Sequence, residues 1–462
     1  MRCACEPEPN AAHRAPRTSF MTDYIAIPPA REVRGTIAAP PSKSATNRAL
    51  VLAAVSETPV EIQGPLESED TRAMARCLAA MGAAFEASPR GLSGRGPLAG
   101  PSGRDVVLDA GESGTASRFM TALASATPGL FVLTGSRRLR ERPVGELVAA
   151  LRSAGAQIDT TGEPDRLPLR IRGASLRAGR VAVDASRSSQ FLSALLLAAP
   201  AVPGGLEVVV SSTVASAPYV ATTLDCLRAF GHEVSAEPDW SRFRVARGRA
   251  AVASYEVPGD YSSALPLLAS AGMSGGRVTV TGLCWPSADA DARAVAVLER
   301  MGVEIRGEPG RVSATARRGG LESVCVAATD FPDAVPALAA LAALAAGESR
   351  FEGIAHLRLK ESDRVASLAA LLTGAGADAR AHDNCLVVAG PTRFRPGGVP
   401  RKLSTFADHR IAMSGALLSL AIPDLLIENP GCVAKSYPRF FRDLESLTVR
   451  EAGGREAGGG RW

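Results

Sequence analysis

The feature that most constrains the fold of this chain is a repeat that shows in the spacing of its residues and hardly in their identity. A helical segment that ends in Leu-x-x-x-Gly and leads into a short strand recurs along the chain. Its glycines stand 71 to 76 residues apart, at Gly82, Gly155, Gly231, Gly302 and Gly376. Glycine directly after a helix is typical of the left-handed C-terminal cap. An interval this regular predicts a row of equivalent structural units instead of one large core.

A second pattern has the same period. An Ala- and Leu-rich helix, a turn and a strand follow one another six times, with strand positions at Glu61, Phe131, Glu207, Val278, Phe351 and Ile427. Helices rich in Ala and Leu suit burial on most sides. The two patterns together predict an α/β fold of six units, with three units in each of two domains of about 220 residues, which is within the usual domain size.

Composition and charge exclude several classes of function. The chain has 462 residues, of which 46% are hydrophobic and 21% charged, as in globular proteins. The net charge of +5 is modest, and Lys and Arg form no stripe with interleaved aromatic residues. An acidic small molecule is therefore a better partner than nucleic acid. No apolar run reaches the roughly 18 residues needed to span a bilayer, so we expect no membrane partner.

The chain ends and the cysteines bear on location. Residues 1–20 contain acids and prolines and lack the apolar segment of a secretory signal, so we expect a disordered extension. Residues 449–462 are rich in glycine and are expected to be a disordered tail. Of the eight cysteines only Cys3 and Cys5 are close together, without a second pair or a histidine at ligand spacing. This pattern argues against disulfides and a zinc site, and predicts a cytoplasmic protein without a metal.

A polar cluster precedes each of the six Ala/Leu helices. In chain order the clusters are PSKSATNR, GESGTASR, SRSSQ, GDYSS, DFPDA and FADHR. Each is expected at a helix N-terminus, where unpaired N–H groups and the helix dipole favour anions. Ser and Asp at such positions can equally be helix caps, so Asp333 is open to both interpretations. Arginines oppose the dipole, and we therefore expect Arg48, Arg118 and Arg410 to bind an anion.

Longer motifs around these clusters identify a family resemblance. PPSKSATNRAL, GESGTASR, RERP, SSQFLSALL, S-x-PY, GDYSSA, FPDA, RLKESDR, DHRIAM and AKSYP follow one another in this order. With them the chain resembles the 5-enolpyruvylshikimate-3-phosphate (EPSP) synthase family over about residues 25–445. The resemblance implies two domains, each a threefold βαβαββ repeat with helices inside and sheets outside, an inside-out α/β barrel. It implies one domain from residues 21–41 and 260–448 and a second from residues 42–259, with the substrates bound in the cleft.

The same resemblance implies the substrate ligands. Shikimate 3-phosphate would be bound by Lys43, Ser44, Arg48, Ser188, Ser189, Gln190, Ser216, Asp333, His356 and Lys360. Phosphoenolpyruvate would be bound by Lys43, Gly114, Arg142, Gln190, Arg364, Arg410 and Lys435. Two positions depart from the usual pattern, because Glu112 and His356 stand where the family commonly has Asn. An acid at position 112 should weaken the binding of an anionic substrate unless it pairs with a cation.

The activity implied is transfer of the enolpyruvyl group of phosphoenolpyruvate to the 5-hydroxyl of shikimate 3-phosphate. Phosphate is released, and the product leads through chorismate to the aromatic amino acids. No metal or other cofactor is implied, and we expect a monomer. We expect Asp333 to accept the hydroxyl proton, Glu361 with Lys43 to move the proton at C3 of the substrate, and Lys435 to assist the leaving phosphate. Carboxylates among so many cations are expected to have lowered pKa values.

Two alternatives stay open. A sister transferase that acts on UDP-N-acetylglucosamine shares the architecture, but it usually carries a reactive cysteine in a loop of the second repeat. The matching region here, TGSRRLRERPVGEL, has no cysteine. A non-catalytic binding protein on the same fold would be expected to have lost at least one of Lys43, Asp333, Glu361 and Lys435, and all four are present.

Overall fold

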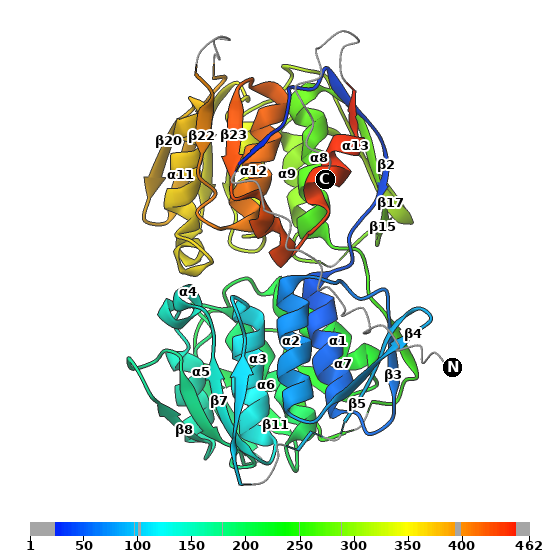
Figure 1. Cartoon of the computed structure of the whole chain (residues 1–462), viewed down its shortest axis with the longest axis vertical. Coiled ribbons are helices and arrows are strands. Elements are labelled where there is room, and N and C mark those ends of the chain that lie inside the picture. Colours follow the sequence, from blue (N-terminus) through cyan, green and yellow to red (C-terminus); the bar gives the residue numbers. More distant parts are fainter. Residues whose placement is uncertain are drawn as a thin grey trace, which may run out of the picture.

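The computed structural model describes residues 24–96, 98–99, 103–177, 179–248, 250–287, 289–392 and 399–449. The predicted extension of residues 1–20 lies outside the described residues, as do residues 450–462 of the predicted tail. Val449 is described and belongs to a strand, so the prediction that the tail begins at residue 449 is wrong by one residue. The chain forms two lobes, one above the other in Figure 1. Each lobe has its own hydrophobic core.

The lower lobe contains three four-stranded sheets, and the first two strands of each sheet run parallel while the others are antiparallel. The first sheet is β14 (Ser254–Glu256), β3 (Val60–Gln63), β5 (Gly91–Arg95) and β4 (Ala84–Ser88). The second is β6 (Asp105–Asp109), β7 (Leu130–Thr134), β9 (Leu169–Arg172) and β8 (Gln157–Thr160). The third is β10 (Gly179–Val183), β11 (Leu206–Val210), β13 (Arg242–Val245) and β12 (Val234–Ala236).

The helices of the lower lobe lie inside these sheets (Figure 1). The three Ala/Leu helices are buried along nearly their whole length: α1 (Lys43–Val55), α3 (Gly114–Ala126) and α6 (Ser189–Ala198). Helices with one exposed side accompany them: α2 (Glu69–Ala80), α5 (Gly145–Ser153) and α7 (Pro218–Ala229). The short helices are α4 (Arg137–Glu141) and η1 (Ala199–Ala201). Small Ala side chains let the inner helices pack closely on all sides.

The upper lobe repeats this plan. Its first sheet is β16 (Glu304–Glu308), β17 (Gly310–Ala316), β15 (Gly276–Leu283), β2 (Glu32–Ala38) and β24 (Thr448–Val449). The second is β18 (Cys325–Ala327), β19 (Gly347–Glu352), β21 (Cys385–Gly390) and β20 (Asp378–His382). The third is β1 (Tyr24–Ala26), β23 (Leu425–Glu428) and β22 (Arg401–Leu403). Its inner helices are α8 (Tyr261–Ser274), α10 (Val335–Ala342) and α12 (His409–Ala421). The others are α9 (Arg293–Arg300), η2 (Ala355–Leu359), α11 (Arg364–Ala375), η3 (Pro430–Lys435) and α13 (Phe440–Ser446).

The six-unit α/β architecture predicted from the spacing is confirmed. Each of the six sheets contains one parallel pair, and these pairs are β14–β3, β6–β7, β10–β11, β2–β15, β18–β19 and β22–β23. All five repeat glycines have positive φ, from 83° to 101°, a backbone conformation in which a side chain is costly. The predicted C-terminal caps are therefore confirmed as well.

The chain crosses between the lobes at two adjacent places. Pro41 and Gly259 form an isolated antiparallel bridge. The amide of Ser42 donates to the carbonyl of Pro258, and the amide of Asp260 donates to the carbonyl of Pro40, both at 2.8 Å. The N-terminal strand β2 thereby lies in the upper lobe, parallel to β15. None of the helices within the described residues combines the length and the apolar character needed to cross a membrane.

Candidate active site

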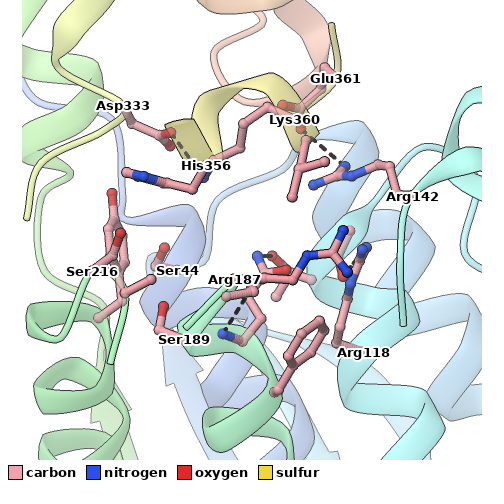
Figure 2. A pocket seen from close by; sticks show the side chains of 18 of the residues that line it. Ser44, Arg118, Arg142, Arg187, Ser189, Ser216, Asp333, His356, Lys360 and Glu361 are labelled. Carbon is pink, nitrogen blue, oxygen red and sulfur yellow. Dashed lines mark hydrogen bonds and ion pairs between the residues drawn. The ribbon is translucent and has the colours of Figure 1, made fainter. Parts of the chain in front are cut away.

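The polar clusters of the sequence lie where inner helices begin, at the junction of the two lobes (Figures 1 and 2). Most of them supply an N-terminal cap through a side chain: Ser42 for α1, Ser113 for α3, Ser188 for α6, Asp260 for α8 and Asp408 for α12. The fifth helix, α10, differs because its cap residue is Ala334 and makes no side-chain hydrogen bond. The interpretation of Asp333 as a helix cap is therefore wrong.

A cavity of about 100 Å³ lies between the lobes and carries strong positive charge. Seven cationic side chains line it, against the three acids Asp70, Asp333 and Glu361. Most of the predicted ligands line this cavity: Lys43, Ser44, Arg48, Gly114, Arg142, Ser188, Ser189, Gln190, Ser216, Asp333, His356, Lys360, Glu361 and Arg364. Figure 2 shows Asp333, His356 and Lys360 on the upper side of the cavity. Ser44, Ser189 and Ser216 face them from below.

Arg410 and Lys435 are predicted ligands that lie behind the lining residues, each with a side chain only 2% exposed. Nη2 of Arg410 lies 3.7 Å from a carboxylate oxygen of Asp333. Nζ of Lys435 lies 3.8 Å from a carboxylate oxygen of Glu361. Each cation therefore influences the cavity through an acid that lines it, Arg410 through Asp333 and Lys435 through Glu361.

Arg364 joins three carboxylates at the top of the cavity. Its side chain is 1% exposed, and it donates at 2.9 Å to each of Asp333, Glu361 and Asp408. A further bond of 3.3 Å reaches the second oxygen of Asp408. These bonds use four of the five N–H donors of the guanidinium, which leaves one for a ligand. The surrounding acids raise the pKa of Arg364 against the opposing effect of burial.

Asp333 and Glu361 are buried carboxylates with low pKa values. Burial by itself would raise the pKa of Asp333, but Lys360, Arg364 and Arg410 hold it well below its usual range. Burial would likewise raise the pKa of Glu361, but Arg142 and Arg364 hold it well below its usual range. The expected lowering of both values is confirmed. Each group is ionised at neutral pH and can accept a proton, as a general base must.

A third acid, Asp70, links the lobes. It stands in the first turn of α2 with a side chain 4% exposed. One carboxylate oxygen lies 3.2 Å from Nζ of Lys43, and the other lies 3.2 Å from Nζ of Lys435 in the upper lobe. Burial would raise the pKa of Asp70, but the two ammonium groups lower it. Lys435 also donates to the backbone carbonyl of Glu112 at 2.8 Å.

The arginines of the lower lobe differ in how many donors they have free. Arg48 donates to Thr223, Ser193 and the carbonyls of Ser44 and Tyr219, so most of its N–H groups are used inside the protein. Arg118 donates to Gly114, Ser117 and Pro143. Arg142 is the exception. Its Nε has no partner, as in Arg118, but its guanidinium as a whole makes only one contact with an acceptor among the described residues, the ion pair of 3.7 Å with Glu361. Arg142 is thus the cation best prepared to bind an anion.

Gly114 explains how Arg142 comes so close to the start of α3. A Cβ atom at position 114 would lie 2.7 to 2.9 Å from three atoms of the Arg142 guanidinium. Any other residue here would displace that side chain. Glu112, the nearby departure from the family pattern, has an exposed side chain that faces a second cavity of about 220 Å³. It takes part in none of the ion pairs between described residues, and its expected effect on binding stays a prediction.

The hydroxyl and amide residues lie on the lower side. The Ser188 hydroxyl accepts from the amide of Gln190 at 3.2 Å, and the side-chain amide of Gln190 donates to Thr115 at 3.2 Å. Ser216 has positive φ, 53°, and its hydroxyl donates across the cleft to the carbonyl of Thr329 at 3.0 Å. Strained backbone of this kind costs about 1 to 3 kcal/mol and is common at functional sites.

Two histidines on the upper side are neutral. Burial lowers the pKa of His356 to about 4, and Lys360 adds to the effect. Burial, Arg410 and Lys43 lower the pKa of His409 well below its usual range. Both ring nitrogens of His409 and Nε2 of His356 lack hydrogen-bond partners among the described residues.

Arg118, which the sequence predicted to bind an anion, lines the cavity, and so do residues for which the sequence suggested no ligand role: Asp70, Thr115, Arg187, Tyr219 and His409. Thr115, Arg187 and His409 belong to the polar clusters, which is a signal that could have included them. Asp70 lies outside every cluster, and its role depends on two lysines that are distant in sequence. Within the described residues, no group of three or more His, Cys, Asp or Glu side chains has the arrangement of a metal site.

A cation-lined cleft between two α/β lobes of three units each, with buried ionised acids at its top, defines an enzyme that acts on anionic small molecules. The profile of the family described as EPSP synthase (3-phosphoshikimate 1-carboxyvinyltransferase) matches residues 27–444. This chain belongs to the EPSP synthase family. The family match favours the main interpretation over the UDP-sugar transferase and the non-catalytic binding protein.

Individual relatives agree with the family match. The 3-phosphoshikimate 1-carboxyvinyltransferase of Methanoculleus marisnigri is 40% identical over 88% of this chain and 95% of that protein. The enzyme of the same description from a Sulfurovum species is 36% identical over 92% of this chain and 99% of that protein. The solved EPSP synthase of Acinetobacter baumannii has a TM-score of 0.73 and 26% identity, and covers 92% of this chain and 98% of that chain.

Proposed function

We propose that this enzyme transfers the enolpyruvyl group of phosphoenolpyruvate to the 5-hydroxyl of shikimate 3-phosphate in the cleft between the lobes. The observation that carries the proposal is the lining of the cavity, where seven cations face three ionised acids. Two polyanionic substrates need an excess of positive charge, and the proton transfers need carboxylates that stay ionised. Both requirements are met by side chains that come from the two lobes together.

Shikimate 3-phosphate binds across the cleft. Its phosphate lies on Ser188, Ser189 and Ser216, and its ring hydroxyls lie near Asp333 and Lys360. The further ligands are Lys43, Ser44, Arg48, Gln190 and His356. In support, Ser189 begins helix α6, whose free N–H groups favour a phosphate, and Asp333 faces it from the upper lobe (Figure 2).

Phosphoenolpyruvate binds between Arg142 and the lysines of the cleft. Arg142 has unused donors and offers its planar fork to the carboxylate or phosphate. Gly114 is required because a side chain there would displace Arg142. The remaining ligands are Lys43, Gln190, Arg364, Arg410 and Lys435, of which Arg364 contributes its one free donor and Arg410 and Lys435 act from behind the lining residues.

The reaction proceeds by addition and elimination. Asp333 accepts the proton of the 5-hydroxyl as its oxygen bonds to C2 of phosphoenolpyruvate, and C3 gains a proton. The tetrahedral intermediate then loses phosphate, and a proton leaves C3 to restore the double bond. The ammonium group of Lys43 supplies the proton that C3 gains, and the carboxylate of Glu361 accepts the proton that C3 later loses and returns it to Lys43. Lys435 neutralises charge on the departing phosphate. The low pKa values keep both acids in the ionised form that can accept a proton.

The two lobes are the two domains, and they must separate to admit the substrates. The cavity of about 100 Å³ is smaller than the 300 to 1,000 Å³ usual for ligand pockets. The adjacent crossings at Pro41 and Gly259 supply the hinge. The enzyme acts as a monomer in the cytoplasm, and the free thiols of the described cysteines support a reducing compartment.

An assay of phosphate release tests the function. The enzyme should release phosphate only when phosphoenolpyruvate and shikimate 3-phosphate are both present, and UDP-N-acetylglucosamine should not replace the second substrate. Small-angle scattering tests the closure. Saturating shikimate 3-phosphate should close the lobes and so decrease the average radius of gyration of the enzyme. Release with phosphoenolpyruvate alone, or with the UDP-sugar, would contradict the proposal.

A further inference from the structure

Arg138 belongs to helix α4 of the lower lobe, yet its guanidinium ends on the upper lobe. Its Nε donates to the backbone carbonyl of Glu361 at 2.9 Å, and its Nη2 donates to the backbone carbonyl of Lys360 at 3.1 Å. The third nitrogen, Nη1, donates to Glu141 at 3.1 Å on the same helix. All three nitrogens are thus fixed, and one planar fork binds two successive carbonyl groups of a segment more than 220 residues away.

This contact is placed where it can report on the closure of the lobes. The two chain crossings, with the bridge between Pro41 and Gly259, lie at one side of the cleft. Figure 1 shows α4 at the other side, below the η2 segment of the upper lobe. Rotation about the crossings would separate atoms at this edge most, so the two hydrogen bonds exist only when the lobes are together.

The carbonyls that Arg138 binds belong to the connection between η2 and α11. This connection carries Lys360 and Glu361, whose side chains point into the cavity, and ends at Asp363, the cap of α11. From above, Arg358 anchors the same region, because it donates to the carbonyls of residues 382 and 383 and to Asp363. The connection is therefore held by the upper lobe at one face and by Arg138 of the lower lobe at the other.

We propose that Arg138 is a positioning residue that couples closure of the lobes to the placement of Lys360 and Glu361. By fixing both carbonyls it fixes the peptide plane between the two residues, and with it the directions of both side chains. Lys360 then keeps its place beside Asp333, and Glu361 keeps its place beside Arg142, at 3.7 Å each. The inference rests on the proposed function of the cleft. Arg138 itself does not line the main cavity, so it acts through the two residues that do.

The first test is Arg138→Met, which keeps the length of the side chain and removes its donors. Arg137→Met is the matched control, since Arg137 is the neighbouring residue, is 96% exposed, and pairs only with the same Glu141 at 3.6 Å among the described residues. The Arg138 variant should lower kcat/KM about 10- to 100-fold, the range for losing hydrogen bonds from a charged group. It should lower kcat at saturation and also raise KM for shikimate 3-phosphate. The control should stay within about twofold of the wild type.

Arg138→Lys keeps the charge but lacks the fork, so it can reach one carbonyl at a time. Its kcat/KM should lie between the wild type and Arg138→Met. A double-mutant cycle with Glu361→Gln separates positioning from general stability. If Arg138 acts through Glu361, it should matter several-fold less in the Glu361→Gln background. Multiplicative effects of the two substitutions on kcat would overturn the proposal.

A measurement that does not depend on turnover separates the role of Arg138 from the proposed reaction. With saturating shikimate 3-phosphate present to close the lobes, hydrogen exchange at the amides of residues 360–363 should be faster in Arg138→Met than in Arg137→Met, with unchanged exchange in the core strands. Equal exchange at these amides in the two variants would refute the proposal that Arg138 holds the connection, whatever the activity. Absence of phosphate release by the wild type would refute the proposed function, and the exchange result would still decide whether Arg138 holds the connection.

Discussion

Asp70→Asn is the substitution for which the structure gives the clearest expectation. The carboxylate of Asp70 is 4% exposed and lies 3.2 Å from the ammonium groups of Lys43 and Lys435, which are 13% and 2% exposed. The amide of Asn can accept a hydrogen bond from one of them but carries no charge. Lys43 then loses its ion pair, and Lys435 keeps only the longer one, of 3.8 Å, to Glu361.

The magnitude follows from the burial of this cluster. Removing one partner from a buried ion pair costs about 3 to 5 kcal/mol, because the remaining charge is left uncompensated. For lobes of this size, each kcal/mol shifts Tm by about 2 to 4 °C, so we expect a decrease of about 6 to 20 °C. The pKa of Asp70 is lowered in the folded state, so its stabilisation is complete above pH 5 and is lost only in stronger acid. The difference between variant and wild type should therefore be constant from pH 5 to 8.

Anion binding supplies the decisive assay. Inorganic phosphate should bind the two lysines that Asp70 no longer neutralises, and stabilise the variant by mass action. Its addition should raise Tm of Asp70→Asn more than that of the wild type, as measured by calorimetry or scanning fluorimetry. Glu69→Gln is the matched control, because Glu69 is the adjacent acid in the first turn of α2 and is exposed. A decrease in Tm no larger than that of the control, or an equal phosphate effect in variant and wild type, would refute the reasoning.

Three further substitutions test other parts of the site. Asp333→Asn should lower turnover at least about 100-fold in the phosphate-release assay while shikimate 3-phosphate still binds, and a loss below about tenfold would mean that another group is the base. Arg142→Lys should raise KM for phosphoenolpyruvate more than KM for shikimate 3-phosphate, since a point charge cannot replace the fork, and equal effects would contradict the assignment. His356 has a pKa of about 4 in place of about 6.5, so the unfolded chain binds more protons between these values and stability falls as pH decreases. Between pH 7.5 and 5 the free energy of unfolding, measured with urea, should decrease by about 2 kcal/mol less in His356→Asn than in the wild type. Parallel curves of unfolding free energy against pH would exclude His356 as the source of the decrease.

The sequence predicted the architecture well because the features that specify it are local. Gly82 and its four counterparts mark the ends of helices, and a residue with positive φ is recognisable wherever it stands. The capping residues Ser42, Ser113 and Ser188 also act within their own turns. Helix N-termini were therefore predictable, and with them most of the side chains that line the cavity.

The partners of those side chains were not predictable, because they come from distant parts of the chain. Arg364 was expected to bind phosphoenolpyruvate, yet most of its donors hold Asp333, Glu361 and Asp408. Asp333 was open to a capping role, and only the structure shows that α10 begins after it and that its carboxylate faces cations instead. Asp70 has no local signature at all, since an acid in the first turn of a helix is ordinary.

The acids of the cleft have a common consequence for closure. Seven cations gathered in one cavity repel one another and would hold the lobes apart. Asp70 pairs with Lys43 below and Lys435 above, and Glu361 pairs with Arg142 below and Arg364 above. Each acid thus offsets part of the repulsion across the cleft. Anionic substrates can add to this attraction only by binding the same cations, so substrate binding and closure use one set of charges. Arg138, at the far edge of the cleft, links that closure to the placement of Lys360 and Glu361.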